Sequence, residues 1–289
     1  MTAPRTLLKA WQLKPRKNMG QNFLTDPRVA GAIVSAAALS AEDTVAEIGA
    51  GLGALTIPAA GVARRVIAIE KDIRLAELLK TELAVCRLEN VDILSRDVLT
   101  CDFTSMAPPR GLKVLGNLPY NISSQVVIRL IDQRRSIRTA VLMFQKELAR
   151  RLAAAPGSKS YGRLSVLLQY CATIETVCLV PASAFYPRPK VDSMVIRIDF
   201  RKPPAGLRTD EKVLRRIVRA AFGRRRKTLR NSLAGGLGEL DSEKAGRLLT
   251  EAGIDPRRRA ETLSVAEFVA LTNRFREDFG KRASGHCRQ

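Results

Sequence analysis

The sequence contains one histidine and few cysteines. That histidine, His286, stands close to the C-terminal end. Imidazole is the usual proton acceptor near neutral pH and a common metal ligand, so we expect neither a histidine acid or base nor a histidine metal site. The cysteines form no close Cys-x-x-Cys pair, and their odd number argues against a disulfide framework: Cys86, Cys101, Cys171, Cys178 and Cys287. We therefore expect a metal-free protein of the reducing cytoplasm.

Long apolar runs are also absent. No stretch is long enough to span a bilayer, so we expect no membrane insertion. The chain has 289 residues, 46% of them hydrophobic, which is enough for a substantial core, and we expect one large domain and one small one. Nothing in the sequence indicates an obligate dimer, so a monomer is expected.

Acidic residues are scarce at both ends of the chain. The formal net charge is +21; residues 1–25 carry five Lys or Arg and no acid, and residues 201–289 carry 22 Lys or Arg against 11 acids. A polyanion such as RNA is the expected partner, although anionic membranes or simple solubility would also account for basic surface. The basic N-terminus weakly resembles a transit peptide, but it is poor in serine, and we favour an RNA-contacting arm.

Hydrophobic patterning predicts alternating strands and helices. Asp26 is expected to cap a helix that begins at Pro27. The expected strands are 44–48, 66–69, 91–94, 113–115 and 140–144, and the expected helices between them are 54–63, 71–85, 123–131 and one from residue 146. Pro58 should bend its helix, and Ser123 should cap the helix that it begins. This alternation predicts an α/β fold with a parallel, doubly wound sheet.

Several polar residues and glycines fall at the ends of these strands, where ligands collect in such sheets. They are the turn Glu47-Ile-Gly-Ala-Gly-Leu-Gly53, then Glu70, Asp97 and Asn117. An acid such as Glu70 can accept both hydroxyls of a ribose, and Asp97 can accept an adenine amine. A nicotinamide dehydrogenase remains open on these residues. The glycine spacing differs from the one that cradles a pyrophosphate, and we favour S-adenosylmethionine, which has no phosphate.

The tetrapeptide Asn117-Leu118-Pro119-Tyr120 suggests the reaction. An adenine amine is a poor nucleophile because its lone pair is delocalised, and two acceptors aimed at its hydrogens would restore electron density to the nitrogen. The Asn117 side-chain carbonyl and the Leu118 carbonyl, oriented by Pro119, can act in this way. Tyr120 offers a flat face on which the base can stack. Alternatively, the tetrapeptide is only a strand followed by a turn.

The C-terminal part is expected to be helical. A linker at 201–209 precedes expected helices at 210–222, 227–233, 241–252 and 264–279. Ser264 and Glu267 form a capping box, and Gly253 is a plausible helix stop. Two basic runs are candidates for RNA phosphate contacts, although solvated surface is the simpler interpretation: Arg224, Arg225, Arg226 and Lys227, and Arg257, Arg258 and Arg259.

Over nearly its whole length, the chain resembles the ribosomal RNA adenine dimethyltransferases of the KsgA type. The matching blocks are Gly20–Leu24, Glu47–Gly53, Glu70–Asp72, Asp97, Asn117–Ser123, Gln145–Glu147, Pro181–Ser193 and Phe222–Leu229. The resemblance implies a Rossmann-like methyltransferase sheet with a small all-α C-terminal domain. It divides the chain into a catalytic domain at 1–205, with the basic arm, and a helical RNA- or ribosome-binding domain at 206–289.

The resemblance also implies residue roles. The S-adenosylmethionine site would be lined by Asn22, Leu24, Gly49, Gly51, Glu70, Asp97 and Asn117. The target adenine would be held by Asn117, Leu118, Pro119 and Tyr120, with Phe185 closing over its other face. The expected reaction is N6,N6-dimethylation of two adjacent adenines near the 3′ end of the 16S RNA of the small ribosomal subunit, with S-adenosylhomocysteine as product.

Three other functions remain open. A large-subunit ribosomal RNA methyltransferase of the antibiotic-resistance type shares the catalytic motifs, although the long C-terminal region favours the small-subunit family. A DNA adenine methyltransferase would more often show Asp or Asn followed by Pro-Pro-Tyr, so Leu118 weighs against it. A nucleic-acid-binding assembly factor could keep the fold and depend little on catalysis.

Overall fold

The computed structural model describes residues 2–204 and 206–279, so His286 and Cys287 lie outside it. Within these limits the chain forms two compact units. One comprises residues up to 150 together with 172–202, and the other comprises 151–171 together with residues from 203 onward. Residues 151–171 thus group with the C-terminal helices, which nothing in the sequence had indicated. The division of function at residue 205 stays a prediction.

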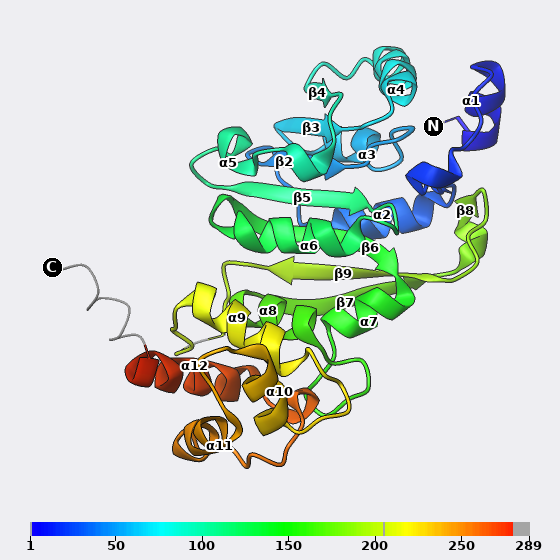
Figure 1. Ribbon diagram of the computed structural model, residues 1–289. Coiled ribbons are helices and arrows are strands. Elements are labelled where there is room, and N and C mark those ends of the chain that lie inside the picture. Colours follow the sequence, from blue (N-terminus) through cyan, green and yellow to red (C-terminus); the bar gives the residue numbers. More distant parts are fainter. Residues whose placement is uncertain (1, 205, 280–289) are drawn as a thin grey trace, which may run out of the picture. The chain divides into compact units, whose positions relative to one another are not determined.

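A seven-stranded sheet forms the first unit, in the order β4-β3-β2-β5-β6-β9-β7 (Figure 1). The five expected strands are present and parallel: β2 (Thr44–Ile48), β3 (Arg65–Ile69), β4 (Val91–Leu94), β5 (Leu112–Asn117) and β6 (Ile137–Gln145). The sequence did not predict the two antiparallel strands that extend this parallel sheet. β9 (Ser193–Asp199) lies antiparallel to both β6 and β7 (Thr173–Val180), because a loop rather than a crossover helix joins β7 to β9.

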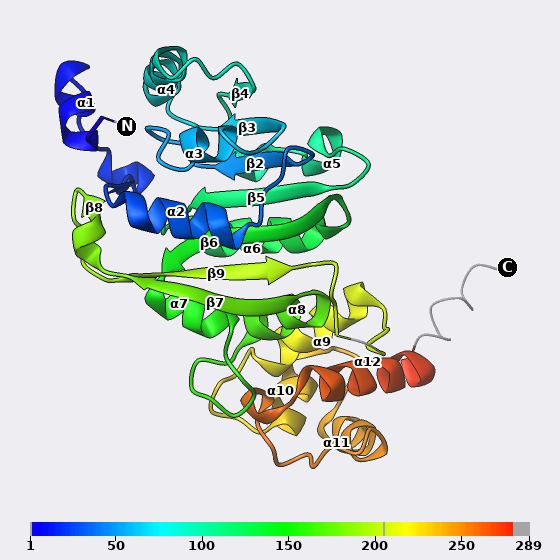
Figure 2. The same cartoon turned by 180° about the vertical axis from the view of Figure 1, so that it is seen from behind.

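Helices cover both faces of this sheet. Helices α2 (Pro27–Ala36) and α3 (Thr56–Ala60) pack on one face, and α6 (Ser123–Asp132) lies on the other (Figures 1 and 2). Buried Ile33 of α2 and Ala59 of α3 join Val45, Leu115 and Val141 of the strands in one apolar cluster. Its burial holds the layers together and so fixes the strand ends that carry the polar residues.

The remaining elements of the first unit are short, apart from α4. The helices are α1 (Pro4–Ala10), α4 (Ile73–Val85), α5 (Phe103–Met106) and α7 (Lys146–Leu152), and two short strands, β1 (Phe23–Leu24) and β8 (Phe185–Tyr186), form a separate pair. Single 3-10 turns occur at Lys17–Met19, Val98–Thr100, Arg134–Ser136 and Ala182–Ala184. Leu7 and Leu8 of α1 pack in a buried cluster with Leu75 and Leu78 of α4. The basic N-terminus is therefore partly folded onto the unit.

Local signals in the sequence were mostly interpreted correctly, with two corrections. Asp26 caps α2 by accepting a hydrogen bond from the Arg28 amide at 2.9 Å, as predicted. Helix α3 is much shorter than expected, and Pro58 falls in its first turn, where no intrahelical bond is lost. The predicted bend stays a prediction. Ser123 does not cap α6: it is the first helical residue, and its hydroxyl donates to the Pro119 carbonyl at 2.9 Å.

The second unit consists of helices, as expected. They are α8 (Arg163–Cys171), α9 (Glu211–Ala221), α10 (Leu229–Gly236), α11 (Ser242–Glu251) and α12 (Val265–Phe279), with a 3-10 turn at Ala260–Thr262. Its core includes Phe268, whose ring stacks on Phe222 with centroids 5.8 Å apart. The capping box is confirmed, since Ser264 and Glu267 exchange hydrogen bonds between side chain and backbone amide. Gly253 follows the C-cap residue of α11 and has a φ of +72°, the left-handed conformation that is typical of a helix stop.

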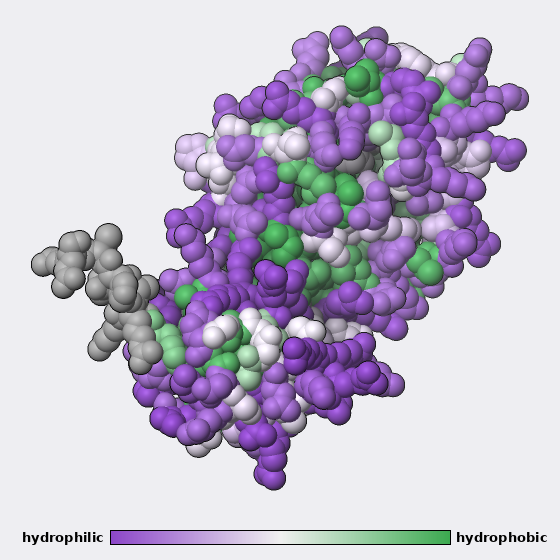
Figure 3. Space-filling view, in the orientation of Figure 1, coloured by the Kyte–Doolittle hydropathy of each residue, from purple (hydrophilic) through white to green (hydrophobic). Residues whose placement is uncertain are grey.

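The surface is hydrophilic over most of the face shown in Figure 3. Among residues 2–204 and 206–279, no helix combines the length and apolarity needed to cross a bilayer. A surface rich in Lys and Arg is consistent with the net charge of +21.

A substitution of Gly116 on β5 would test how closely this strand must approach β2. A Cβ atom at this position would lie 2.9 Å from the Ile48 carbonyl oxygen and 3.1 Å from Leu118 Cδ2. We expect Gly116→Ala to lower the free energy of unfolding by about 1–3 kcal/mol, because a packed strand interface cannot absorb the extra methyl group. Urea denaturation measures this change.

Gly31→Ala in α2 is the matched control. Gly31 is exposed, and no atom lies within 4 Å of its hypothetical Cβ. This change should instead raise stability, by up to about 1 kcal/mol, because alanine is the better helix former. Equal effects of the two substitutions would contradict the close approach at Gly116.

Candidate active site

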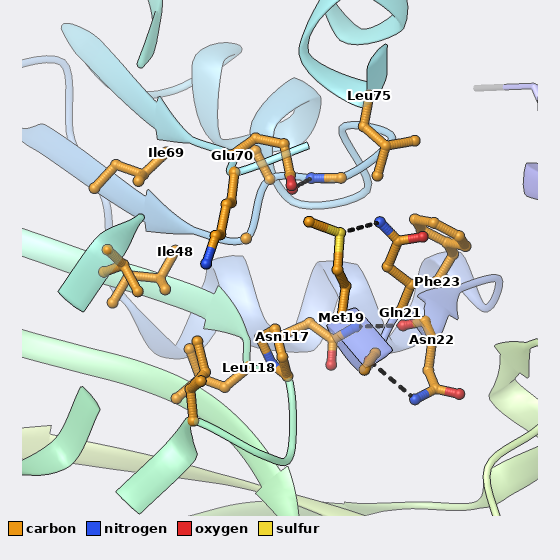
Figure 4. Close-up of a pocket in the computed structure, with 18 of the residues that line it drawn as sticks. Met19, Gln21, Asn22, Phe23, Ile48, Ile69, Glu70, Leu75, Asn117 and Leu118 are labelled. Carbon is orange, nitrogen blue, oxygen red and sulfur yellow. Dashed lines mark hydrogen bonds between the residues drawn. The ribbon is translucent and has the colours of Figure 1, made fainter. Parts of the chain in front are cut away.

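A cavity lies at the carboxyl ends of strands β2, β3 and β5 (Figure 4). It is lined by parts of residues 18–24, 47–55, 69–75, 96–98 and 117–122. These segments are far apart in the sequence. Those that follow β2, β3, β4 and β5 meet because parallel strands finish at the same edge of a sheet. The sequence predicted that the polar residues at the strand ends lie close together, and in the structure they line one cavity.

The cavity brings together most of the residues predicted for the site. Its lining includes Asn22, Leu24, Gly49, Gly51, Glu70, Asp97, Asn117, Leu118, Pro119 and Tyr120. Phe185 is the exception. It pairs with Leu24 across β1 and β8, is only 4% exposed and packs in the apolar core rather than on the cavity wall. Its contact with an adenine stays a prediction that this arrangement does not support.

Some lining residues were not predicted individually, although one signal pointed to them. Met19 and Gln21 line the cavity, and Figure 4 shows both side chains at its centre, with Gln21 donating to the Met19 sulfur. They flank Gly20, whose φ is +65°. A Cβ on Gly20 would lie 3.0 Å from Asn121 Oδ1 and 3.2 Å from Pro119 Cβ. The Gly20–Leu24 block therefore marks a segment that packs directly on the turn at residues 117–121.

Glu70 ties the glycine turn to the end of β3. Its Oε2 accepts from the Gly51 amide at 2.9 Å, and its Oε1 accepts from the Asp72 amide at 2.8 Å. Burial raises the pKa of Glu70, and the two amide hydrogen bonds partly oppose that rise. Each carboxylate oxygen keeps a second lone pair, so the group can still accept two hydrogen bonds from a ligand.

Asp97 is held as an anion at the end of β4. Its Oδ2 lies 2.8 Å from Lys71 Nζ, and its Oδ1 accepts from the Leu99 amide at 2.9 Å. The hydrogen bond from Lys71, followed by that from Leu99, holds the pKa of Asp97 below its usual range. The side chain is therefore an acceptor at neutral pH, as a contact with an amine requires.

The side-chain amide of Asn117 has one fixed orientation. Its Nδ2 donates to the backbone carbonyl of Asn22 at 2.9 Å, which leaves Oδ1 as the free acceptor. The Leu118 amide donates to the Met143 carbonyl at 3.2 Å, whereas the Leu118 carbonyl accepts no bond from another described residue. Pro119 is held in turn by Ile122 and Ser123, which both donate to its carbonyl. Two free carbonyl oxygens therefore follow each other in a rigid turn.

Tyr120 is anchored by its hydroxyl group. The hydroxyl lies 2.8 Å from Ser193 Oγ, and Ser193 is fully buried at the start of β9. Burial raises the pKa of Tyr120, so the phenol stays neutral at physiological pH. This contact could not be predicted from the sequence, because Ser193 lies 73 residues further along the chain. A tyrosine held in this way presents its ring in a defined position.

The predicted RNA-binding residues lie in two loops of the helical unit. Arg224, Arg225, Arg226 and Lys227 are exposed between α9 and α10, and Arg257 and Arg259 are exposed after α11. Arg258 differs, because its guanidinium bonds to Glu267 and to the Thr262 carbonyl. This contact ties the loop to the start of α12, so a phosphate contact of Arg258 would compete with the fold. RNA binding by the remaining residues stays a prediction.

Glu47, the first residue of the glycine turn, is a buried acid to which the sequence assigned no individual role. It is 2% exposed, lines the cavity and accepts a hydrogen bond from Thr56 Oγ1. Burial raises the pKa of Glu47 to about 8; Thr56 partly opposes this rise, and nearby Glu70 adds to it. Across residues 2–204 and 206–279 no group of three or more His, Cys, Asp or Glu side chains could hold a metal ion.

The raised pKa of Glu47 predicts a pH-dependent stability. Its stabilising contribution is complete below the unfolded pKa near 4.5 and is lost as the pH rises to about 8, because the folded protein binds the proton more tightly. Between pH 5 and pH 8, wild type should lose at least about 1.4 kcal/mol relative to Glu47→Gln, the equivalent of one pKa unit. Urea unfolding at both pH values measures this difference, and parallel curves for the two proteins would contradict it.

Comparison with known proteins finds relatives that match most of this chain. The family model described as ribosomal RNA adenine dimethylase matches residues 12–277. A protein of Desulforapulum autotrophicum named ribosomal RNA small subunit methyltransferase A is 50% identical over 275 residues, which cover 94% of this chain and 96% of the relative. The protein of the same name from Bacillus mycoides is 43% identical over 265 residues, which cover 89% of this chain and 90% of the relative.

Two solved structures extend the agreement to the fold. A dimethyladenosine transferase from Plasmodium falciparum has a TM-score of 0.77 and 28% identity, covering 88% of this chain and 98% of its own. The 23S rRNA methyltransferase ErmE has a TM-score of 0.67 and 28% identity, covering 88% of this chain and 99% of its own. The expected Rossmann-like sheet with a helical C-terminal region is confirmed. With a family model matching most of its length, this chain belongs to the ribosomal RNA adenine dimethylases.

Proposed function

We propose that this protein transfers methyl groups from S-adenosylmethionine to the N6 atoms of two adjacent adenines near the 3′ end of small-subunit (16S) ribosomal RNA. The observation that carries the proposal is the orientation of Asn117. Because its Nδ2 is committed to the Asn22 carbonyl, Oδ1 faces a ligand beside the free Leu118 carbonyl. Two adjacent acceptors suit a primary amine, which offers two hydrogens.

The cavity suits the adenosyl part of the methyl donor. Glu70 keeps lone pairs for two ribose hydroxyls, and anionic Asp97 can accept from the adenine amine. Gly49 and Gly51 have φ of +73° and +53°, so the turn brings bare backbone close to the ligand. Leu24, Ile69 and Val98 supply apolar wall. We assign the donor to these residues and S-adenosylhomocysteine as its product.

The residues of the turn activate the target amine. When bound, S-adenosylmethionine supplies an electrophilic methyl group on a positively charged sulfur. Asn117 Oδ1 and the Leu118 carbonyl hold the amine and stabilise the positive charge that develops on its nitrogen, as fixed dipoles that need no reorganisation. Tyr120 stacks on the base after it leaves the RNA stack. The surplus proton passes to solvent, so no protein base is required.

The helical unit supports RNA as the substrate. Its exposed arginines between α9 and α10 offer sequence-independent phosphate contacts, which position a substrate rather than read it. The relatives at 43–50% identity carry small-subunit names, whereas the large-subunit enzyme ErmE is 28% identical. These identities favour small-subunit RNA over the large-subunit alternative. We further propose that the protein acts as a monomer, without a metal, on small subunits in the cytoplasm.

Methylation assays with labelled S-adenosylmethionine test the substrate. Under-methylated small subunits, large subunits, naked ribosomal RNA and DNA are incubated with the protein, and dimethyladenine is then mapped. We expect label on two adjacent adenines near the 3′ end of the small-subunit RNA. Labelling of large subunits or DNA alone would refute the proposed substrate. An assembly factor with dispensable catalysis would be indicated if an inactive variant fully replaced the wild type in cells.

Asn117→Ala should separate binding from chemistry. We expect methyl transfer to fall by about a hundredfold or more, because a preorganised acceptor is lost, with donor affinity largely retained. Single-turnover kinetics and calorimetric titration of the donor measure the two effects. Asn231→Ala, an exposed amide on α10, is the matched control and should transfer at the wild-type rate. Equal rates for Asn117→Ala and wild type would exclude the proposed role.

Variants of Tyr120 should separate stacking from anchoring. Tyr120→Ala removes the ring and should lower kcat/KM by roughly ten- to a hundredfold, corresponding to a lost stacking contact of about 1–3 kcal/mol. Tyr120→Phe keeps the ring but leaves buried Ser193 without its partner, so it should lose less activity and some stability.

Combining Tyr120→Phe with Ser193→Ala provides the control. Removing both partners eliminates the unpaired hydroxyl, so the double variant should recover most of the stability that Tyr120→Phe loses. Thermal unfolding and kcat/KM are measured for all variants. If Tyr120→Phe were as inactive as Tyr120→Ala, the hydroxyl rather than the ring would be essential, and the stacking role would be wrong.

A further inference from the structure

Residues 16–22 contact both parts of the active-site cavity, and we call them the crossing segment (Figure 4). Toward the tetrapeptide, the Asn22 carbonyl accepts from Asn117 Nδ2 at 2.9 Å. Toward the start of α4, Gln21 Nε2 donates to Asp72 Oδ2 at 3.2 Å. The crossing segment therefore connects the turn that carries Asn117 with the helix that follows Glu70.

Asp72 binds the crossing segment with one of its two carboxylate oxygens. The residue is only 4% exposed. Its Oδ2 accepts from Gln21 and lies 3.5 Å from Arg16 NH1, whereas its Oδ1 accepts from the Arg74 amide at 3.2 Å and so caps α4. The Arg74 guanidinium also approaches both oxygens. Capping needs only Oδ1, so the contact of Oδ2 with Gln21 and Arg16 serves another purpose.

The Gln21 side chain is oriented by its own segment. Its Oε1 accepts from the Arg16 amide at 2.8 Å, which leaves the Nε2 hydrogens for Asp72 and for the Met19 sulfur. A primary amide whose oxygen is engaged offers only donors on its other side. The bond between Gln21 and Asp72 is therefore directional, with the amide as donor and the carboxylate as acceptor.

Asp72 also contacts the acid that is assigned to the donor. Its backbone amide donates to Glu70 Oε1 at 2.8 Å. Hydrogen bonds thus lead from Glu70 through Asp72 to Gln21, and the next residue, Asn22, holds the Asn117 amide. A continuous set of contacts is a physical connection, and coupling between its ends is a separate property that must be measured.

We propose that Asp72 and Gln21 are positioning residues for methyl transfer, which fix the crossing segment so that the Asn22 carbonyl keeps Asn117 Oδ1 turned toward the target amine. The inference rests on the proposed function, which gives Asn117 its role. Neither side chain needs to touch the reacting atoms. Loss of their bond would let the Asn22 carbonyl shift, and a misplacement of about 1 Å can slow a reaction substantially.

Asp72→Asn removes the acceptor for Gln21 and keeps the helix cap. Asparagine caps helices as well as aspartate does, and the backbone amide can still bind Glu70. The new NH2 group, however, would face the NH2 group of Gln21. Methyl transfer at saturating donor and RNA should fall by about ten- to a hundredfold in single-turnover experiments.

Asp26→Asn is the matched control for this change. Asp26 caps α2 in the same Asp-x-Arg arrangement, accepting from the Arg28 amide at 2.9 Å and pairing with its guanidinium. It does not belong to the cavity lining. This variant loses the same charge at a helix start and should transfer methyl groups at the wild-type rate.

Exchanging the two side-chain types tests the bond itself. Gln21→Glu alone places a second carboxylate against Asp72 and should slow transfer as Asp72→Asn does. The double variant Gln21→Glu/Asp72→Asn again pairs an acceptor with a donor, at unchanged net charge, and should recover most of the wild-type rate. A double variant as slow as either single variant would overturn the proposal.

A double-mutant cycle tests whether Asp72 acts through Asn117. In the Asn117→Ala background, Asp72→Asn should slow transfer little further, because the side chain that it positions is already missing. Losses that multiply in the combined variant would show that Asp72 affects transfer independently of Asn117. The positioning role would then be wrong.

Hydrogen exchange of the free protein provides a readout that does not depend on activity. The Met19 and Gly20 amides donate to the Arg16 and Lys17 carbonyls at 3.1 and 3.0 Å, so their exchange reports the order of the crossing segment. Exchange should be several-fold faster in Asp72→Asn, and slow again in the exchanged double variant. Unchanged exchange in Asp72→Asn would contradict the inference.

The two proposals fail in different ways. If wild type methylated no small-subunit RNA, the proposed function would be refuted, whatever hydrogen exchange showed. If wild type methylated this RNA and both single variants transferred as fast as wild type, only the positioning role of Asp72 and Gln21 would be refuted.

Discussion

The hydrogen bond from the Asn117 side-chain amide to the Asn22 carbonyl connects segments 95 residues apart in the chain. It decides that the amide oxygen of Asn117, rather than its NH2 group, is left free at the cavity. An amide rotated by half a turn would offer hydrogens there, where the amine of the proposed function needs acceptors. The bond requires β5 to end beside the Gly20–Leu24 segment. That approach depends on the left-handed backbone conformation of Gly20. It also depends on the apolar core between the helices and the sheet, which fixes the position at which each strand ends.

The antiparallel strands contribute to the site as well as to the sheet. β9 lies between β6 and β7, and its first residue, Ser193, holds the hydroxyl of Tyr120. The parallel strands end beside Glu70 and at Asn117, while the antiparallel strand holds the hydroxyl of Tyr120 and so fixes the orientation of its ring. A sheet of five parallel strands alone would leave that ring free to rotate, at an entropic cost to each binding event.

The helical unit uses its arginines in two different ways. Arg216 and Arg258 are paired with Glu239 and Glu267, so they stabilise the fold. Arg163, Arg219 and Arg224 converge on one cavity without a carboxylate. An excess of positive charge alone could not distinguish these groups, because the pairing of a guanidinium depends on contacts between helices that are distant in sequence. The distinction separates arginines that hold the fold together from those that have no partner among the described residues.

The sequence alone determined the five parallel strands, the four C-terminal helices and the polar residues at the strand ends, because these follow from local periodicity, capping and glycine placement. The chemistry of Asn117-Leu118-Pro119-Tyr120 could also be inferred, since it depends on adjacent residues. Only the tertiary structure decided the antiparallel strands, the partner of Tyr120, the inward packing of Phe185 and the grouping of Arg163 with Arg219 and Arg224. Each of these depends on contacts between residues far apart in the chain, and such contacts are set by the packing of whole elements rather than by any local pattern.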